Sequence, residues 1–144
     1  MKTKKKIRIR PEYILNIFPY TIEWKNKQTT LFVMQTLSEF TNFNYQILID
    51  SQLKERLISI KILGLRTTAL LMPGVGAARG YFDFPNLKGK YSVKIEKLDG
   101  EVNEYTLHIK PDRITLSEPP PSAFIHLSSA ALTLIDADHY LKVS

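Results

Sequence analysis

The sequence predicts an all-β protein whose strands pack as an antiparallel β-sandwich. Apolar and polar residues alternate from Ile7 to Leu116, and this two-residue period is typical of strands that are buried on one face. Turn-forming residues interrupt the pattern about every ten positions, as they do in sandwiches and barrels. Helical patterns are few, so we expect strands to fill most of the chain.

The expected strands follow one another in chain order. Alternation predicts strands at residues 7–9, 13–17, 45–49 and 57–62, with Pro19 breaking the second of them. Residues 30–40 fit either a strand or a short helix capped by Thr30, and we favour the strand. Residues 129–141 fit either a short helix near the C-terminus or a hairpin that turns at residues 136–138, and both alternatives remain open.

An Asp-Gly pair predicts a hairpin turn within residues 90–110. A two-residue turn at Asp99 and Gly100 would place Ile95 opposite Glu104 and mix the apolar and polar faces. A loop of three or five residues avoids this, although it also places Glu96 opposite Glu104, a mild repulsion. The expected cross-strand pairs are Ile95 with Tyr105, Val93 with Leu107, and Tyr91 with Ile109.

The C-terminal part is expected to return to the sandwich. Pro111 and Asp112 turn the chain into a strand at residues 113–116, and Pro119–Pro121 form a stiff connector. The remaining residues are too few for a domain, so we expect them to pack on the sandwich; the alternative is an arm that docks on a neighbouring subunit. The residues expected in this packing are Phe124, Ile125, Leu127 and Leu132. The expected parts are a basic arm or edge strand at 1–10, the sandwich at 11–118, and the return segment at 119–144.

The positive charge of the chain is concentrated at its N-terminus. The formal net charge is +6, and residues 1–10 hold six of the 20 Lys and Arg residues and no acid. The rest of the chain therefore carries 14 basic and 14 acidic residues and is neutral. A length of 144 residues is enough for one core of ordinary size without disulfide or metal support.

Composition excludes several classes of protein. Without cysteine there is no disulfide framework, no thiolate zinc site and no thiol nucleophile. The longest apolar runs, such as residues 69–72, are far shorter than the roughly 18 residues needed to cross a bilayer. Arg8, Arg10 and Pro11 interrupt the apolar stretch that a secretion signal would need. We therefore expect a cytoplasmic protein with no membrane span.

Residues 80–95 match a pattern that joins two buried strands. Phe82 and Phe84 would anchor the first strand, Leu87 would fill the loop, and Gly89 would permit the turn into the second strand. This run resembles the pattern "G-x-F-x-F-x-x-L-x-x-G-x-Y-x-V" of carboxypeptidase-regulatory-like and Cna-B-type domains, which are transthyretin-like β-sandwiches. The resemblance implies an immunoglobulin-like or transthyretin-like sandwich. It also implies a non-catalytic module that stiffens, spaces or binds, with no catalytic residues to transfer.

The basic N-terminal arm is the first candidate contact. Its charges alternate with Ile7 and Ile9, as in an edge strand whose charged face stays in water. Such a cluster can bind phosphates, but it lacks the interleaved aromatic residues that single-strand binding uses. We expect a solubilising tail, strand exchange with a neighbour, or docking on an acidic surface. The candidate residues are Lys2, Lys4, Lys5, Lys6, Arg8 and Arg10.

The glycine-rich segment 69–80 is the second candidate contact. Gly74, Gly76 and Gly80 lack the spacing of a dinucleotide-binding fingerprint, and no Lys-Ser or Lys-Thr follows, as a phosphate loop requires. The segment is either a mobile connection between strands or a contact loop with apolar area and one directed charge. The residues that would make the contact are Leu70, Leu71, Met72, Val75 and Arg79.

The sequence offers no clear catalytic or metal-binding pattern. Asp136, Asp138 and His139 could ligate a metal, but calcium and manganese need more oxygen ligands than this segment supplies. His108 is expected on the outward face of the hairpin, in water. No G-x-S-x-G motif is present. We therefore assign no catalytic residue, no metal site and no cofactor.

The sequence thus predicts a non-enzymatic structural or protein–protein interaction module, within an oligomer or a larger assembly. The alternative is a nucleic-acid-binding accessory protein that uses the arm for sequence-independent phosphate contacts. An enzyme of unknown reaction is the least favoured interpretation, and no small-molecule substrate is identified.

Overall fold

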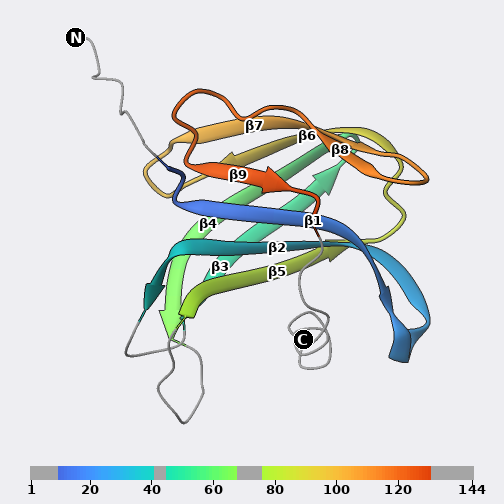
Figure 1. Cartoon of the computed structure of the whole chain (residues 1–144), viewed down its shortest axis with the longest axis horizontal. Coiled ribbons are helices and arrows are strands. Elements are labelled where there is room, and N and C mark those ends of the chain that lie inside the picture. Colours follow the sequence, from blue (N-terminus) through green and yellow to red (C-terminus); the bar gives the residue numbers. More distant parts are fainter. Residues whose placement is uncertain (1–9, 41–44, 68–75, 131–144) are drawn as a thin grey trace.

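The chain folds as a mixed β-sheet that is nearly closed into a barrel (Figure 1). The computed structural model describes residues 10–40, 45–67 and 76–130. Within them, a three-residue 3-10 helix at Glu23–Lys25 joins the first two strands. The nine strands are β1 (Tyr13–Ile22), β2 (Lys27–Phe40), β3 (Tyr45–Lys54), β4 (Leu57–Thr67), β5 (Gly76–Phe84), β6 (Gly89–Glu96), β7 (Val102–Ile109), β8 (Ile114–Leu116) and β9 (Ile125–Ser128). The prediction of an all-β chain is confirmed.

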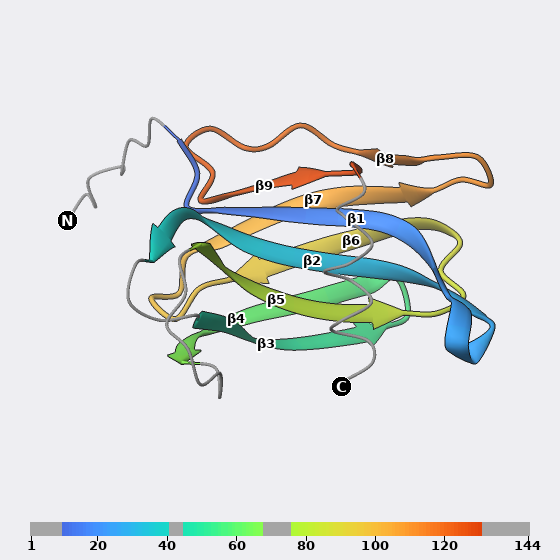
Figure 2. The same cartoon turned by 60° about the horizontal axis from the view of Figure 1, so that its bottom comes forward.

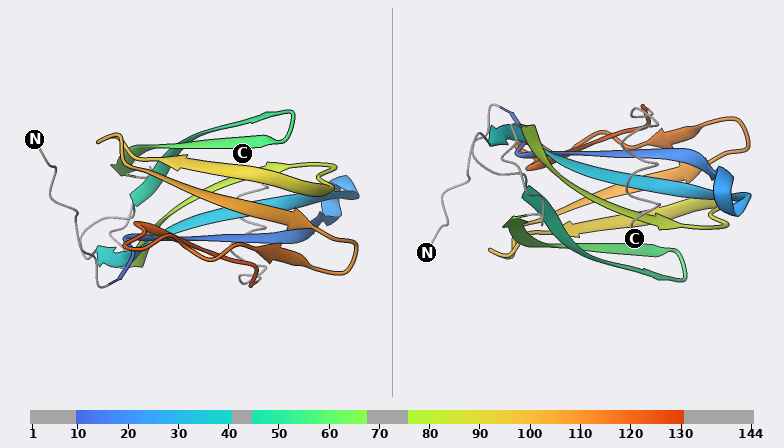
Figure 3. Two further views of the ribbon diagram at one scale, coloured as in Figure 1. Left: turned by 90° about the horizontal axis from the view of Figure 1, so that it is seen from above. Right: turned by 90° about the horizontal axis from the view of Figure 1, so that it is seen from below.

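One sheet contains all nine strands, in the order β8-β7-β6-β4-β3-β5-β2-β1-β9. Three of its pairings are parallel, those of β1 with β9, β3 with β5, and β4 with β6. The sheet therefore differs from the antiparallel sandwich that the sequence predicts. Seen from above and below, β3 and β4 form one wall of the molecule and β1 and β9 the opposite wall (Figure 3).

The core fills the space between these walls. Alternate residues of each strand point inward, as Leu15 and Ile17 do in β1 and Val93 and Ile95 do in β6. Aromatic rings fill the centre, with the ring centroids of Phe32 and Phe82 stacked 4.8 Å apart. The two-residue alternation in the sequence thus corresponds to one buried face of each strand.

The outer surface of the barrel differs between its two walls: it is mainly polar on one wall and carries buried apolar residues on the other. On β3, β4, β6 and β7 the outward positions are mainly polar, although Leu57 and Val102 are exposed among them. Lys61 lies between Asp50 on one side and Glu96 on the other. On β1 and β2 the outward side carries five buried apolar residues beside the buried polar residues Asn16 and Thr29. The apolar residues are Phe18, Tyr20, Ile22, Leu31 and Val33, which form a second cluster separate from the core.

Several strand predictions hold and one fails. The preferred strand at residues 30–40 is confirmed as part of β2. Pro19 does not break β1, which continues to Ile22. Among the described residues β9 pairs with β1 only as far as Asn16, so Pro19 lies at an edge of the described sheet, where a missing N–H group is tolerated.

The β6–β7 hairpin has the predicted odd loop but a different register. Its loop holds five residues, 97–101, and Ile95 lies opposite Asn103 rather than Tyr105. The faces are still sorted as predicted, because a two-residue shift keeps each side chain on its own side. The expected repulsion of Glu96 by Glu104 is wrong, because Lys94 lies opposite Glu104.

The described part of the C-terminal segment joins the barrel wall. β9 runs parallel to β1, with Ile125 opposite Tyr13 (Figure 2). Phe124 and Ile125 are fully buried in the core, and Leu127 packs partly buried against it. Leu132 lies outside the described residues, as does the helix-or-hairpin alternative for most of residues 129–141.

Candidate functional site

The described residues that flank the two predicted contact segments lie at one end of the barrel. Arg10 and Leu65, near the end of β4, line one hollow, and Lys97 of the β6–β7 turn pairs with Glu12 beside it. The end of β4 and the β6–β7 turn both lie on the left in Figure 1. Residues 1–9 join the described chain at Arg10, and residues 68–75 lie between β4 and β5. The basic arm and the glycine-rich loop are therefore attached to the same end, which we call the loop end.

A hollow of about 430 Å³ opens at the loop end. Tyr13 and Thr36 line it from opposite positions of β1 and β2, and Leu65 lines it from β4. Leu65 is exposed there over 39% of its surface. These side chains belong to core-facing positions, so the hollow is the open mouth of the barrel interior.

Thr36 fixes the shape of β2 beside this hollow. The pairing of β2 with β5 is irregular between Gln35 and Glu39. At the irregularity the backbone N–H of Ala78 donates to Thr36 Oγ1 at 2.9 Å, and this hydroxyl donates to the carbonyl oxygen of Ser38 at 2.9 Å. The threonine hydroxyl thus replaces missing strand-to-strand hydrogen bonds at a bulge.

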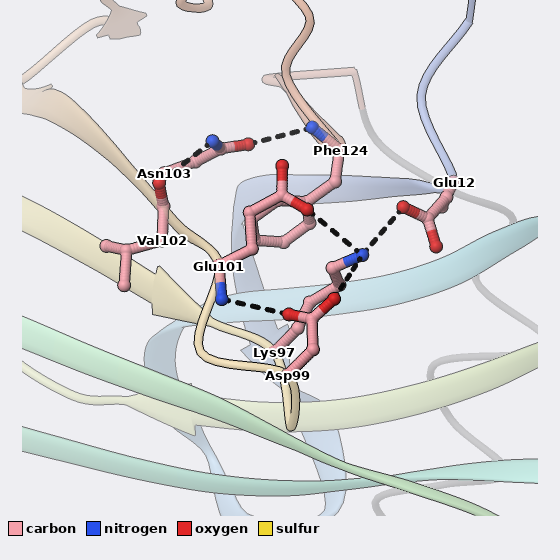
Figure 4. Close-up of polar contacts among 7 residues, drawn as sticks. All are labelled: Glu12, Lys97, Asp99, Glu101, Val102, Asn103 and Phe124. Atoms are coloured by element: carbon pink, nitrogen blue, oxygen red, sulfur yellow. Dashed lines mark hydrogen bonds and ion pairs between the residues drawn. The ribbon is translucent and has the colours of Figure 1, made fainter. Parts of the chain in front are cut away.

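Lys97 forms the centre of a charged cluster at the same end (Figure 4). Its Nζ lies 2.8 Å from Glu12 Oε2, 3.3 Å from Glu101 Oε1 and 3.6 Å from Asp99 Oδ2. The ammonium also lies 5.1 Å from the centroid of the Phe124 ring. The Lys97 side chain is only 11% exposed, so this cation is held between one aromatic ring and three carboxylates.

The cluster shifts the pKa values of its members. Burial acts to lower the pKa of Lys97, but hydrogen bonds and charges from Glu12 and Glu101 outweigh it and raise the pKa above its ordinary value. The backbone N–H of Glu101 donates to Asp99 at 2.9 Å and is the main cause of the lowered pKa of that carboxyl. One ammonium among three carboxylates leaves a local charge of −2.

Two further side chains close the barrel where β7 meets β9. The backbone N–H of Phe124 donates to Asn103 Oδ1 at 2.9 Å, and the Tyr105 hydroxyl donates to the carbonyl oxygen of Ile125. Burial raises the pKa of Tyr105 to about 12. We call these contacts, together with the Lys97–Glu12 pair, the seam. The seam joins β7 and the β6–β7 turn to the start of β9 and to Glu12, which precedes β1, through side chains rather than through a continuous strand pairing.

The structure describes only two of the predicted contact residues. Arg10 is exposed at the loop end, and Arg79 is half-buried, with its Nε 3.5 Å from Gln35 Oε1. The other residues of the prediction lie outside the described part. They are Lys2, Lys4, Lys5, Lys6, Arg8, Leu70, Leu71, Met72 and Val75.

The predicted loop at residues 69–80 is shorter than expected. β5 begins at Gly76, so Arg79 and Gly80 belong to a strand. Gly80 has a packing role: a Cβ atom there would lie 2.7 Å from the carbonyl oxygen of Ile47 and 2.6 Å from Ile49 Cδ1. The glycine therefore permits the close approach of β3 to β5.

Sequence reasoning missed the Lys97 cluster. The spacing of Lys97, Asp99 and Glu101 around a turn was a local signal for a charge cluster. Glu12 gave no such signal, because its distance to Lys97 is set by the closing of the barrel.

Neither metal ligation nor a membrane helix is evident in the described part of the chain. No group of three or more His, Asp or Glu side chains is placed there to hold a metal ion. The described ranges also contain no helix long and apolar enough to span a membrane. His108 lies opposite Lys90, and its pKa is lowered by burial and by the charges of Lys110 and Lys90. Asp136, Asp138 and His139 are outside the described residues.

Comparison with known proteins gives no match: no family model, no curated protein and no solved structure resembles the chain closely enough to be recognised.

Proposed function

We propose that the protein is a non-enzymatic structural or protein–protein interaction module that makes its contacts through the loop end of the barrel. The observation that carries this proposal is the attachment of both candidate contact segments to one end. A partner that meets this end can engage the basic arm and the apolar loop together, and two linked contacts bind more tightly than either alone.

The polar side chains near the loop end have structural contacts, which supports a structural rather than a catalytic role for them. Lys97 is surrounded by carboxylates, while Asn103 and Tyr105 bond to the backbone of the C-terminal segment. Thr36 completes a β-bulge. Each of these groups has a partner that holds two strands together, which suits a stable scaffold that presents segments to a partner.

Residues 80–95 form a rigid connection between β5 and β6, which suits a scaffold. Leu87 is 7% exposed between β5 and β6, and Gly89 has a φ of 82° at the turn. Leu87 thus fills the loop and Gly89 permits the turn, as the residue pattern of 80–95 predicts.

The charge at the loop end is mixed, because the arm with its six basic residues joins the barrel beside the carboxylates of the Lys97 cluster, and mixed charge favours a protein partner over nucleic acid. Glu12, Asp99 and Glu101 leave a net negative charge close to Arg10, where the arm begins. Phosphate groups are repelled by such a cluster, whereas a protein surface of mixed charge can meet both the arm and the carboxylates.

Size-exclusion chromatography with light scattering tests the proposal. We expect the full chain to have the mass of an oligomer and the chain lacking residues 2–10 to have a lower mass. The control carries Lys54→Gln, Lys88→Gln and Lys110→Gln, which remove three charges at strand ends away from the loop end and should leave the mass unchanged. A monomer for the full chain at all concentrations would argue against self-assembly through this end.

The loop contact has its own test. Leu71→Asp combined with Val75→Asp should abolish association while leaving the melting temperature nearly unchanged, because a contact loop contributes little to the core. A large fall in melting temperature would show instead that these two side chains belong to the core.

A further inference from the structure

The outward side of β1 and β2 is buried although it faces away from the core. We call it the apolar outer face; it consists of Phe18, Tyr20, Ile22, Leu31 and Val33. Phe18 lies opposite Leu31, and Asn16 lies opposite Val33, so these side chains stand on the side opposite to the core residues of the same strands. Leu31 and Val33 are nevertheless 0% exposed.

The described strands do not provide a second layer over this face. All nine belong to one sheet, and a sheet cannot cover its own outer side. Within the described residues, Tyr81 is the partly buried apolar side chain that packs against the cluster, and it comes from the neighbouring strand β5. An apolar sheet face needs a layer from elsewhere to keep it from water.

The path of β9 shows where such a layer can come from. β9 runs in the same direction as β1, and Ser128 lies opposite Asn16. A chain that continues in this direction passes beside Phe18, at the edge of the apolar outer face. The described chain ends there, at residue 130.

The remaining residues have the composition and length of a cover. Residues 131–144 follow, and at about 3.3 Å per residue they can span up to about 46 Å. The rest of β1, residues 17–22, is about 20 Å long by the same rise. The apolar residues available for contact are Leu132, Leu134, Ile135, Tyr140, Leu141 and Val143.

We propose that residues 131–144 dock on the apolar outer face of the same chain and shield it. This intramolecular contact goes beyond the proposed function, because it involves a side of the barrel rather than the loop end. The alternative is that the C-terminal segment docks on a neighbouring subunit, and labelling of the apolar outer face can distinguish the two.

The absence of cysteine allows a direct test by thiol labelling. Val33→Cys places a single thiol of similar size on the apolar outer face, and Val93→Cys places one in the barrel core; both valines are 0% exposed. We expect a maleimide to react at least tenfold faster with Val33→Cys in a chain ending at Ala130 than in the full chain. Val93→Cys should stay protected in both chains, and a synthetic peptide of residues 131–144 should restore protection of Val33→Cys.

A full-length variant guards against unfolding of the shortened chain. Leu132→Ser, Leu134→Ser and Ile135→Ser together should expose Val33→Cys while Val93→Cys remains protected. Equal labelling rates of Val33→Cys with and without an intact C-terminal segment would overturn the proposal. Protection that disappears on dilution, together with a dimer mass in light scattering, would identify a second copy as the cover and would also overturn it.

Discussion

Lys97 Nζ and Glu12 Oε2 lie 2.8 Å apart, although the two residues are separated by 85 positions in the chain. The pair joins the β6–β7 turn to the start of β1, at the end where the barrel closes. Its lysine side chain is 11% exposed, so water screens this ion pair less than a typical surface pair.

Replacing the lysine should destabilise the barrel more than replacing the glutamate. Lys97→Met leaves three carboxylates without their common cation, and we expect a loss of about 1–2 kcal/mol in the free energy of unfolding. Glu12→Gln leaves two carboxylates on the lysine and should cost less. Urea unfolding measures both, with Lys94→Met on the polar outer face as control. A loss for Lys94→Met equal to that for Lys97→Met would contradict a special role for the cluster.

Tyr105→Phe should loosen β9 without unfolding the molecule. The carbonyl oxygen of Ile125 loses its hydroxyl donor in a buried position, which costs about 1–2 kcal/mol. Hydrogen exchange locates the effect: amide protons of β9 should exchange faster, while those of β3 and β4 keep their protection. Uniform acceleration in all strands would show a global loss of stability instead.

Gly80→Ala should disturb the contact of β3 with β5. The added Cβ would meet the backbone oxygen of Ile47, which cannot move aside as a flexible side chain can, so we expect a cost of about 1–3 kcal/mol. In Gly100→Ala, the control, the new Cβ meets nothing within 4 Å, and only the φ of +90° is unfavourable. Thermal unfolding compares the variants, and faster exchange in β3 and β5 should occur only for Gly80→Ala.

Stability should fall on the alkaline side above pH 10. Burial raises the pKa of Tyr13 and Tyr105, and the carboxylates raise the pKa of Lys97, from ordinary values of 10.0 for tyrosine and 10.5 for lysine. The folded chain therefore holds more protons than the unfolded chain in this range, and stability decreases as pH rises. Urea unfolding followed by circular dichroism at a series of pH values measures this, and Tyr105→Phe should lose less stability above pH 10.

Stability should also fall as the pH becomes acidic, because here the folded chain binds fewer protons than the unfolded chain. The lowered pKa values of His108 and Asp99 mean that the folded chain holds fewer protons than the unfolded chain, so stability decreases as pH falls. We expect a first small decrease below the ordinary pKa of 6.5 for histidine and a second below 3.8 for aspartate. Urea unfolding at a series of acidic pH values measures both steps, and His108→Gln should remove the first and leave the second.

Binding to generic duplex DNA should not depend on the basic arm if the loop end takes a protein partner. A salt titration of the full chain and of the chain without residues 2–10 measures this. Affinity that weakens steeply with salt would favour the nucleic-acid alternative, provided that the deletion lowers the slope by about 0.9 for each phosphate that the arm neutralises.

Strands and their buried faces were predictable because they depend on local alternation. The hairpin illustrates the limit. Alternation required an odd loop, and the five-residue loop at 97–101 obeys it. Both expected loop lengths kept Ile95 opposite Tyr105, whereas the observed register places Asn103 there. In this register Lys97 lies against Glu12 and Asn103 bonds to Phe124. Neither contact is local, so the sequence could not predict the register, and the predicted register differs from the observed one by two residues.

The architecture was less predictable for the same reason. A sandwich and a barrel have the same alternation along each strand, and they differ in which distant strands meet. Here the parallel pairings of β1 with β9 and of β4 with β6 bring all strands into one sheet. The loop end follows from this closure, so its position depends on contacts that no single segment encodes.

The order of strands in the sheet has a consequence for synthesis on the ribosome. β1 is the first of the described strands to be made, and its neighbour β9 is the last. The edge of β1 therefore has to wait for its partner until most of the chain has been made, which slows folding and invites wrong pairing. Pro19 lies on that waiting edge, and because it cannot donate a hydrogen bond it makes β1 a poor template for a stray strand.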